Sequence, residues 1–368
     1  MNPLKTLNSL GQSLWYDNIH RAMIASGELA AMIEEDGLRG ITSNPTIFEK
    51  AIAGNADYDA AIRNYLRHHP QADARELFFA LAIEDIQAAA DLLLPVYQTE
   101  QGHDGLVSLE VSPDLAHDTD GTITEAHRLW ERVARPNLMI KVPATAAGIP
   151  AVEELIAAGI NVNATLLFGV ERYQQIADAY LSGLESRLRR GQPIDRVASV
   201  ASFFVSRVDA AVEKALVPHP IEADALRGKI AIANAKIAYA AYHELFGGQR
   251  FAELAQEGAK PQRLLWASTG TKSAGLSDVL YIEALIGPHT VTTVPPATYN
   301  AYRDHGKPHS TLDQGLDEAK AQLQTLTRLG INLKQLTQKL EEEGVVSFAN
   351  SFTTLLTAIK SKAGQLTE

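Results

Sequence analysis

Lys141 is the residue whose type and surroundings most clearly indicate chemistry. It lies in "NLMIKVPAT", residues 137–145, between Ile140 and Val142, and such a run is typical of a parallel strand that is buried on both faces. Because burial disfavours a charged ammonium, we expect a neutral amine that can attack a carbonyl carbon and form a Schiff base. Two alternatives stay open: the side chain could extend to solvent at the strand end, or it could pair with a carboxylate such as Glu110.

A Schiff-base reaction also needs groups that move protons. Water must leave the first adduct, and a substrate hydroxyl must lose its proton if a carbon–carbon bond is to break. Asp17 and Glu110 are the carboxylates near the ends of predicted strands, so one could act as base on the substrate while the other relays protons through Thr165 and a water molecule. The iminium is itself the electron sink, so we expect neither a metal nor an organic cofactor.

Further polar residues near predicted strand ends could bind a substrate. They are Asn44, Asn163, Ser202, Arg207 and Ser268. Each alone has an ordinary structural explanation, such as a turn at Asn44 before proline, but together they predict one site. Arg207 could bind an anion together with Ser268 and Lys272. The backbone of "STGTKS", which contains both of these partners, could also approach an oxyanion at its glycine.

The positions of these residues depend on a regular alternation of short and long segments. Short apolar or β-rich runs, the candidate strands, cover residues 14–18, 40–45, 106–112, 138–145, 160–168, 197–207, 263–269 and 290–295. The segments between them have the apolar spacing of helices, so the pattern predicts an α/β fold with a parallel sheet. Eight strands favour a closed (β/α)8 TIM barrel, whose sites lie at the carboxyl ends of the strands. An open doubly wound sheet is the alternative, but no G-x-G-x-x-G follows the first strand.

Two helical segments exceed what a barrel needs. One is an insertion between the second and third strands, at about 49–100, and the other is a set of C-terminal helices at about 308–368. In the second segment we expect a capping box at Ser310 and Asp313, and helices that stop at Gly330 and Gly344. A last amphipathic helix that starts near Phe348 is expected to pack on the barrel. No linker or repeat divides the chain, so we expect a single domain over 1–368.

Composition excludes several classes of function. The net charge of −11 over 368 residues argues against nucleic acid as a partner, since such proteins carry clustered Lys and Arg. The absence of cysteine excludes disulfides and thiolate sites. The chain also lacks an H-E-x-x-H pair, so we predict no catalytic zinc site. With no signal-like N-terminus and no apolar stretch near the roughly 20 residues that span a bilayer, we expect a soluble, cytoplasmic protein without a membrane partner.

The ordered motifs of the chain resemble those of the transaldolase family, in particular its longer bacterial type. They read "WYDN", "GITSNPTIF", "SLEVSPDLAHDT", "NLMIKVPATAAGIPAVEEL", "GINVNATLLF" and "SRVD", and the resemblance runs from about residue 10 to the C-terminal helices. It implies a (β/α)8 barrel of the class I aldolase superfamily with Lys141 as the Schiff-base lysine. The implied activity is that of a transferase that moves a dihydroxyacetone unit from sedoheptulose 7-phosphate to glyceraldehyde 3-phosphate. The products are erythrose 4-phosphate and fructose 6-phosphate, in the non-oxidative pentose phosphate pathway.

The resemblance also implies roles for the candidate residues. Asp17 would be the base in carbon–carbon cleavage, while Glu110 and Thr165 would handle protons around the imine. Hydroxyls of the bound unit would be held by Asn44, Asn163 and Ser202, and the phosphate by Arg207. Sugar phosphates are then the expected partners, of a monomer or a homodimer.

Two positions bear on how far the resemblance extends. Shorter transaldolases end the seventh strand in Ala-Ser-aromatic-Arg, whereas this chain continues from Ser268 to Lys272 as "STGTK", so Lys272 would have to replace the second phosphate cation. Phe204 stands where a tyrosine, as in the related fructose 6-phosphate aldolases, could protonate the bound carbanion. Phenylalanine cannot do so, which favours transfer over the first alternative function, an aldolase that releases free dihydroxyacetone. The second alternative is a catalytically silent sugar-phosphate binding protein, which the joint presence of the catalytic residues disfavours.

Overall fold

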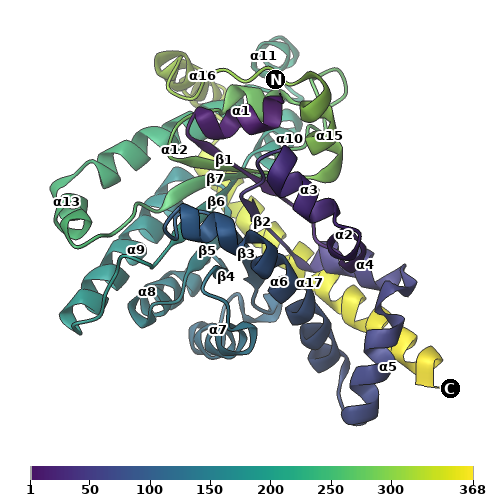
Figure 1. Cartoon of the computed structure of the whole chain (residues 1–368). Helices are drawn as coiled ribbons and strands as arrows, with labels where there is room; N and C mark the ends of the chain where they lie inside the picture. The colour runs from purple at the N-terminus through teal and green to yellow at the C-terminus, as the bar shows by residue number, and fades with distance from the viewer. Residues whose placement is uncertain (1, 368) are drawn as a thin grey trace.

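The barrel predicted from the sequence is confirmed by a computed structural model, which describes residues 2–367 (Figure 1). Its strands are β1 (Gln12–Tyr16), β2 (Gly40–Ile41), β3 (Leu106–Glu110), β4 (Leu138–Pro143), β5 (Val162–Leu167), β6 (Ser199–Phe204), β7 (Arg263–Ala267) and β8 (Thr290–Val294). Each strand pairs in parallel with the next, and β8 pairs with β1, so the sheet has no free edge. The open-sheet alternative is therefore wrong.

Strand β2 is much shorter than the predicted run 40–45. Only Gly40 and Ile41 pair as a strand, because Asn44 already caps the following helix through its side chain. Gly40 lies against an indole ring: a Cβ atom at this position would be 2.4 Å from Cε2 of Trp15. Glycine is thus required where β2 passes Trp15. Because the strand ends at Ile41, the polar residues that follow it lie at the mouth of the barrel.

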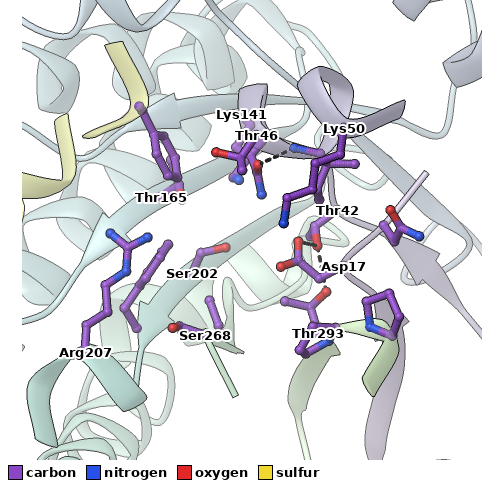
Figure 2. Close-up of a pocket in the computed structure, with 18 residues that line it drawn as sticks. Asp17, Thr42, Thr46, Lys50, Lys141, Thr165, Ser202, Arg207, Ser268 and Thr293 are labelled. Carbon is purple, nitrogen blue, oxygen red and sulfur yellow. Dashed lines mark hydrogen bonds between the residues drawn. The ribbon is translucent and has the colours of Figure 1, made fainter. Parts of the chain in front are cut away.

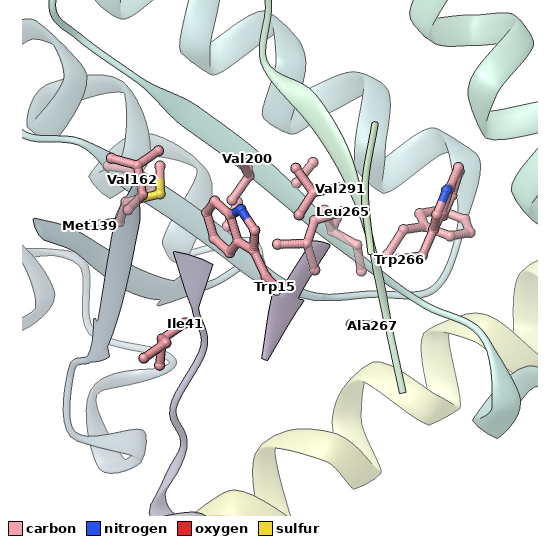
Figure 3. Packing of buried hydrophobic residues seen from close by; sticks show 14 of the residues in the cluster. Trp15, Ile41, Met139, Val162, Val200, Leu265, Trp266, Ala267 and Val291 are labelled. Atoms are coloured by element: carbon pink, nitrogen blue, oxygen red, sulfur yellow. The ribbon is translucent and has the colours of Figure 1, made fainter. Parts of the chain in front are cut away.

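The inside of the barrel is filled by apolar side chains from alternating strands (Figure 3). Trp15, Met139, Val200, Leu265 and Val291 are all at most 1 % exposed. The same hydrophobic core continues outward to helices at both ends of the described chain. This continuity supports the prediction of a single domain.

Helices surround the barrel and fill the expected insertion. They are α1 (Pro3–Ser9), α2 (Arg21–Ala25), α3 (Glu28–Glu35), α4 (Pro45–Ala53), α5 (Asp59–His68), α6 (Ala74–Thr99), α7 (Thr119–Val133), α8 (Gly148–Ala158), α9 (Val170–Arg189), α10 (Ser206–Ala215), α11 (Pro220–Leu226), α12 (Ile230–Phe246), α13 (Gln249–Gln256), α14 (Leu280–Ala284), α15 (Pro296–His305), α16 (Leu316–Arg328) and α17 (Leu333–Thr367), with short 3-10 turns η1 (Ala56–Tyr58) and η2 (Pro113–Leu115). Helices α4 to α6 and η1 form the insertion between β2 and β3. Within residues 2–367, no helix combines the length and apolarity that a bilayer span requires.

The C-terminal helices differ from the sequence prediction at two points. Ser310 and Asp313 do not cap a helix, because α16 begins only at Leu316. Gly330, with φ of 75°, follows α16 as expected, but Gly344 lies inside the continuous helix α17 instead of ending a helix. A Cβ atom on Gly344 would be 3.0 Å from Cδ2 of Leu166, so this glycine serves a close approach of α17 to the barrel.

Helix α17 runs across the carboxyl end of the barrel. It packs against α4, α5, α6 and η2 on one side and against α10 and β5 on another. Figure 1 shows it in yellow, passing from the middle of the molecule to the end of α5. The helix therefore covers part of the face on which the polar strand ends converge.

A buried polar cluster closes the opposite, amino end of the barrel. Asp104 pairs with Arg263 at 3.6 Å and accepts hydrogen bonds from the Ser13 hydroxyl and from Nε1 of Trp15, the latter at 2.8 Å. Arg263 also donates to Ser13 (2.6 Å) and to the carbonyl of His103 (2.6 Å). The cluster ties β1 and β7 to the segment before β3, which fixes the barrel below the site.

Replacing Asp104 by alanine should lower the free energy of unfolding by about 3 kcal/mol, because the charge of Arg263 and the N–H of Trp15 would stay buried without their acceptor. Chemical denaturation measures this loss. Asp91→Ala is the matched control, since Asp91 pairs with Arg135 at the exposed surface and should cost no more than about 1 kcal/mol. Equal losses in the two variants would contradict the structural role of the cluster.

Candidate active site

A cavity of about 320 Å³ opens at the carboxyl ends of the strands (Figure 2). Most of the residues predicted for the site line it: Asp17, Asn44, Lys141, Thr165, Ser202, Phe204, Arg207 and Ser268. The predicted residues Glu110, Asn163 and Lys272 do not line it. Figure 2 shows Asp17, Lys141, Ser202 and Arg207 arranged around one space, although they come from the end of β1, from β4, from β6 and from helix α10.

Lys141 lies at the bottom of the cavity. Only 3 % of the residue is exposed, so the alternative of a side chain that extends to solvent is wrong. Its Nζ atom is 3.4 Å from Oε2 of Glu110 and donates a hydrogen bond to the carbonyl of Ser43 at 3.0 Å. The contact follows from strand register, because Glu110 on β3 is the direct partner of Lys141 on β4. The predicted nucleophile and the predicted carboxylate thus occur together as a buried pair.

Glu110 is buried behind Lys141. Burial raises the pKa of this carboxyl group to about 7, against the opposing effect of the Lys141 charge. Within residues 2–367, neither carboxylate oxygen accepts a hydrogen bond. A carboxyl group in this state can both donate and accept a proton near neutral pH.

Thr165 reaches the cavity from an irregular part of β5. The pairing of β5 with β6 shifts register between Ala164 and Leu167, and Leu166 has a φ of 62°, a left-handed conformation that is costly for leucine. The Thr165 hydroxyl is buried and has no hydrogen-bond partner within residues 2–367. An unpartnered buried hydroxyl beside Lys141 is free to bind a substrate or a proton-carrying water molecule.

Asp17 extends from the end of β1 and is held by a second strand. Its backbone N–H donates to the Val294 carbonyl (2.9 Å), and Oδ1 accepts a hydrogen bond from Thr42 (2.7 Å). Thr42 is itself 2.6 Å from Thr293. Burial raises the pKa of Asp17, while Lys141, the Thr42 hydroxyl and Arg207 each lower it. The carboxylate lines the cavity, and within residues 2–367 its second oxygen accepts no hydrogen bond.

Arg207, in the first turn of α10, is held by aromatic rings. Its Cζ atom is 5.4 Å from the ring centre of Phe204 and 5.9 Å from that of Phe348. Within residues 2–367, no carboxylate forms an ion pair with it, and burial lowers its pKa. A partly buried guanidinium without an anionic partner is well suited to bind an anion.

Strands β6 and β7 supply hydroxyl groups at their carboxyl ends. Ser268, after β7, has a φ of 56° and its Oγ atom lies 2.8 Å from that of Ser206. Ser202 donates to Oδ1 of Asn163 at 2.6 Å, and Nδ2 of Asn163 donates to Ser108 at 3.0 Å. Asn163 therefore orients Ser202 from below the cavity.

Lys272 lies apart from the other predicted residues. It lies in the loop after β7 with part of its surface exposed, outside the cavity lining. Partial burial and the positive charge of Arg207 lower its pKa, which indicates that the two cations lie in each other's field. Its predicted part in phosphate binding stays a prediction.

The sequence analysis did not assign several of the lining residues to the site, and Thr42, Lys50 and Phe348 are among them. Thr42 directly follows Ile41 and could have been found as a polar residue at a strand end. Lys50 and Phe348 lie on helices α4 and α17, so a search of strand ends could not find them. Within residues 2–367, no three or more His, Asp or Glu side chains come together in a way that could hold a metal ion.

Comparison with known proteins places this site in a family. Residues 14–359 match the family model described as Transaldolase/Fructose-6-phosphate aldolase. A protein of Thiobacillus denitrificans named "Transaldolase" is 48 % identical, over 98 % of this chain and 100 % of its own length. Relatives of the same name in Trichodesmium erythraeum (45 %, covering 100 % of this chain and 99 % of the relative) and Thermobifida fusca (47 %, covering 96 % of each) are similarly close. The chain, with its lysine-centred barrel mouth, therefore belongs to the transaldolase/fructose-6-phosphate aldolase family.

Proposed function

We propose that this chain carries out the transaldolase reaction through a Schiff base on Lys141, with Asp17, Glu110 and Thr165 as the groups that move protons. The transaldolase activity itself follows from the family and from relatives of that name over the full chain. The observation that carries the proposed mechanism is the buried contact of Lys141 with Glu110, 3.4 Å apart, at the bottom of the cavity. Sugar phosphates are its substrates.

Imine formation begins when Nζ of Lys141 attacks the C2 carbonyl carbon of a ketose phosphate. The amine can do this only after losing a proton, and Glu110, with a pKa of about 7, is the group in contact that can accept one. Loss of water from the carbinolamine then requires a proton on the departing hydroxyl. Glu110 returns that proton, with the free hydroxyl of Thr165 aligning a relaying water molecule.

Cleavage requires a base on the other side of the substrate. Asp17 takes the proton of the C4 hydroxyl, the C3–C4 bond breaks, and its electron pair moves into the iminium to leave an enamine on Lys141. The aldehyde product departs, and the enamine carbon attacks the carbonyl of an acceptor aldehyde, to which Asp17 returns the proton. Hydrolysis of the new imine releases the product ketose.

The remaining cavity residues hold the substrate in this scheme. Arg207, which lacks a carboxylate partner, binds the phosphate, and Ser268 donates to it. Asn44 and Ser202, the latter oriented by Asn163, hold hydroxyls of the three-carbon unit. Phe204 lines the cavity where a proton donor would favour release of dihydroxyacetone, so the unit stays bound until an acceptor arrives. The proposal also includes a cytoplasmic location and a monomeric or homodimeric state. Light scattering of the purified chain measures the oligomeric state.

Reduction with borohydride in the presence of fructose 6-phosphate should attach the three-carbon unit to Lys141, since reduction traps the imine. Mass spectrometry of a digest locates the adduct, and Lys50, the other lysine of the cavity lining, is the internal control that should stay unmodified. Full activity with no adduct after this treatment would contradict the proposal. Comparing turnover with and without an acceptor aldehyde separates transfer from release of free dihydroxyacetone.

Glu110→Gln should lower kcat by about 10²- to 10⁴-fold, because the amide can neither take a proton from Lys141 nor return one. The wild-type profile of kcat against pH should also have an inflection near pH 7, which the variant loses. Glu125→Gln is the control: Glu125 is also buried, but its carboxylate accepts from Ser112 and does not line the cavity. An unchanged inflection in Glu110→Gln would assign the proton relay to another group.

Thr42→Val should move the acid limb of the kcat/KM profile to higher pH, by about one pH unit. The Thr42 hydroxyl lowers the pKa of Asp17, so its removal raises that pKa. A general base becomes inactive when the pH falls below its pKa. In the variant, activity is therefore lost at a higher pH. Thr46→Val is the matched control, since Thr46 also lines the cavity but donates to Ser351. An acid limb that moves equally in both variants, or in neither, would contradict the role of Asp17 as base.

A further inference from the structure

Phe348 is a residue of the cavity wall that comes neither from the barrel nor from the helical insertion between β2 and β3. It lies on the C-terminal helix α17, is 6 % exposed, and lines the cavity together with Lys141 and Arg207. Its ring centre is 5.7 Å from Nζ of Lys141 and 5.9 Å from Cζ of Arg207. Both distances fall within the roughly 6 Å over which an aromatic face attracts a cation.

The two cations differ in what else holds them. Lys141 already contacts Glu110 and the carbonyl of Ser43. Arg207 has neither an ion pair nor a side-chain hydrogen bond within residues 2–367. Its guanidinium instead forms cation–π contacts with the rings of Phe204 and Phe348. The orientation of the Arg207 guanidinium therefore depends on these rings, whereas that of the Lys141 amine does not.

Aromatic contacts suit a guanidinium that must bind an anion. A carboxylate would occupy the N–H donors and compete with a phosphate, while a ring face attracts the charge and leaves all five donors free. The ring also restricts the rotamers of the long side chain, so less conformational freedom is lost when an anion binds.

The position of Phe348 is fixed on both sides along α17. One turn earlier, Gly344 packs closely on Leu166 of the irregular strand β5. Three residues later, Ser351 accepts a hydrogen bond from Thr46 of α4 at 2.9 Å. Glu341 accepts from Arg172 at 3.0 and 3.2 Å, which ties the same helix to α9. The ring is therefore held by a rigid element at a defined place over the cavity.

We infer that Phe348 is a positioning residue for phosphate selectivity: its ring, with that of Phe204, holds the Arg207 guanidinium with its donors turned to the phosphate of the sugar. The inference rests on the proposed role of Arg207 as the phosphate ligand. It makes the C-terminal helix a part of substrate recognition.

Phe348→Leu keeps an apolar side chain but removes the aromatic face, and Phe348→Tyr keeps the face. Inorganic phosphate, used as a competitive inhibitor against fructose 6-phosphate, probes the anion site directly. In Phe348→Leu its inhibition constant and the KM for fructose 6-phosphate should each rise roughly threefold to thirtyfold with little change in kcat, whereas Phe348→Tyr should stay within about twofold of the wild type. Phe352→Leu is the matched control: Phe352 is one turn further along α17, is equally buried, and packs on Phe78 away from the cavity.

A second measurement separates this inference from the proposed function. Dihydroxyacetone carries no phosphate, so its borohydride trapping on Lys141 should be as fast in Phe348→Leu as in the wild type. Slower trapping with unchanged phosphate inhibition would overturn the inference and place the role of the ring at Lys141. Equal phosphate inhibition in the Leu and Tyr variants would also overturn it, whereas failure of trapping in the wild type would count against the Schiff-base proposal alone.

Discussion

The buried contact between Lys141 and Glu110 is the constraint on which the rest of the site depends. Removing two ionisable groups from water costs several kcal/mol for each ion, and their attraction offsets this only in good geometry. Here the parallel register of β3 and β4 places the two side chains next to each other, and the Ser43 carbonyl accepts from the amine. A pKa near 7 for Glu110 relieves the cost further, because the carboxyl group is partly neutral. The same burial that makes the pair expensive limits the access of bulk water to an imine.

The charged groups around the cavity form two sets with different functions, one for proton transfer and one for anion binding. The carboxylates of Asp17 and Glu110 both lie near Lys141, where protons must move, and each is shifted toward its neutral form by burial. Within residues 2–367, Arg207 forms no ion pair with a carboxylate, and the rings of Phe204 and Phe348 contact it instead. Asp17 and Arg207 act on each other through their charges but form no ion pair within residues 2–367, although both line one cavity of about 320 Å³.

Sequence patterns predicted the barrel and the residues at its strand ends because both follow from local periodicity. Lys141 could be identified because a single cation interrupts an apolar strand, and Glu110 because strand ends of a parallel barrel meet at one face. Phe348 could not be predicted as a lining residue, since its part in the cavity depends on how α17 packs after the barrel has closed. Gly344 was interpreted as a helix stop because glycine usually weakens helices, but close packing on Leu166 determined its position. Tertiary contacts of this kind leave no periodic signal.

The location of Phe348 on the last helix has a consequence for synthesis of the protein. All eight strands are complete by Val294, so a nascent barrel can place Lys141 and Asp17 at its mouth before α17 has left the ribosome. At that stage the lysine faces an open surface, and Arg207 has only one of its two rings. Full shielding of the amine and full ordering of the guanidinium therefore require α17 to dock across a barrel whose strands were made before it. Selectivity for substrate in this sense depends on a helix that is synthesised after the catalytic barrel.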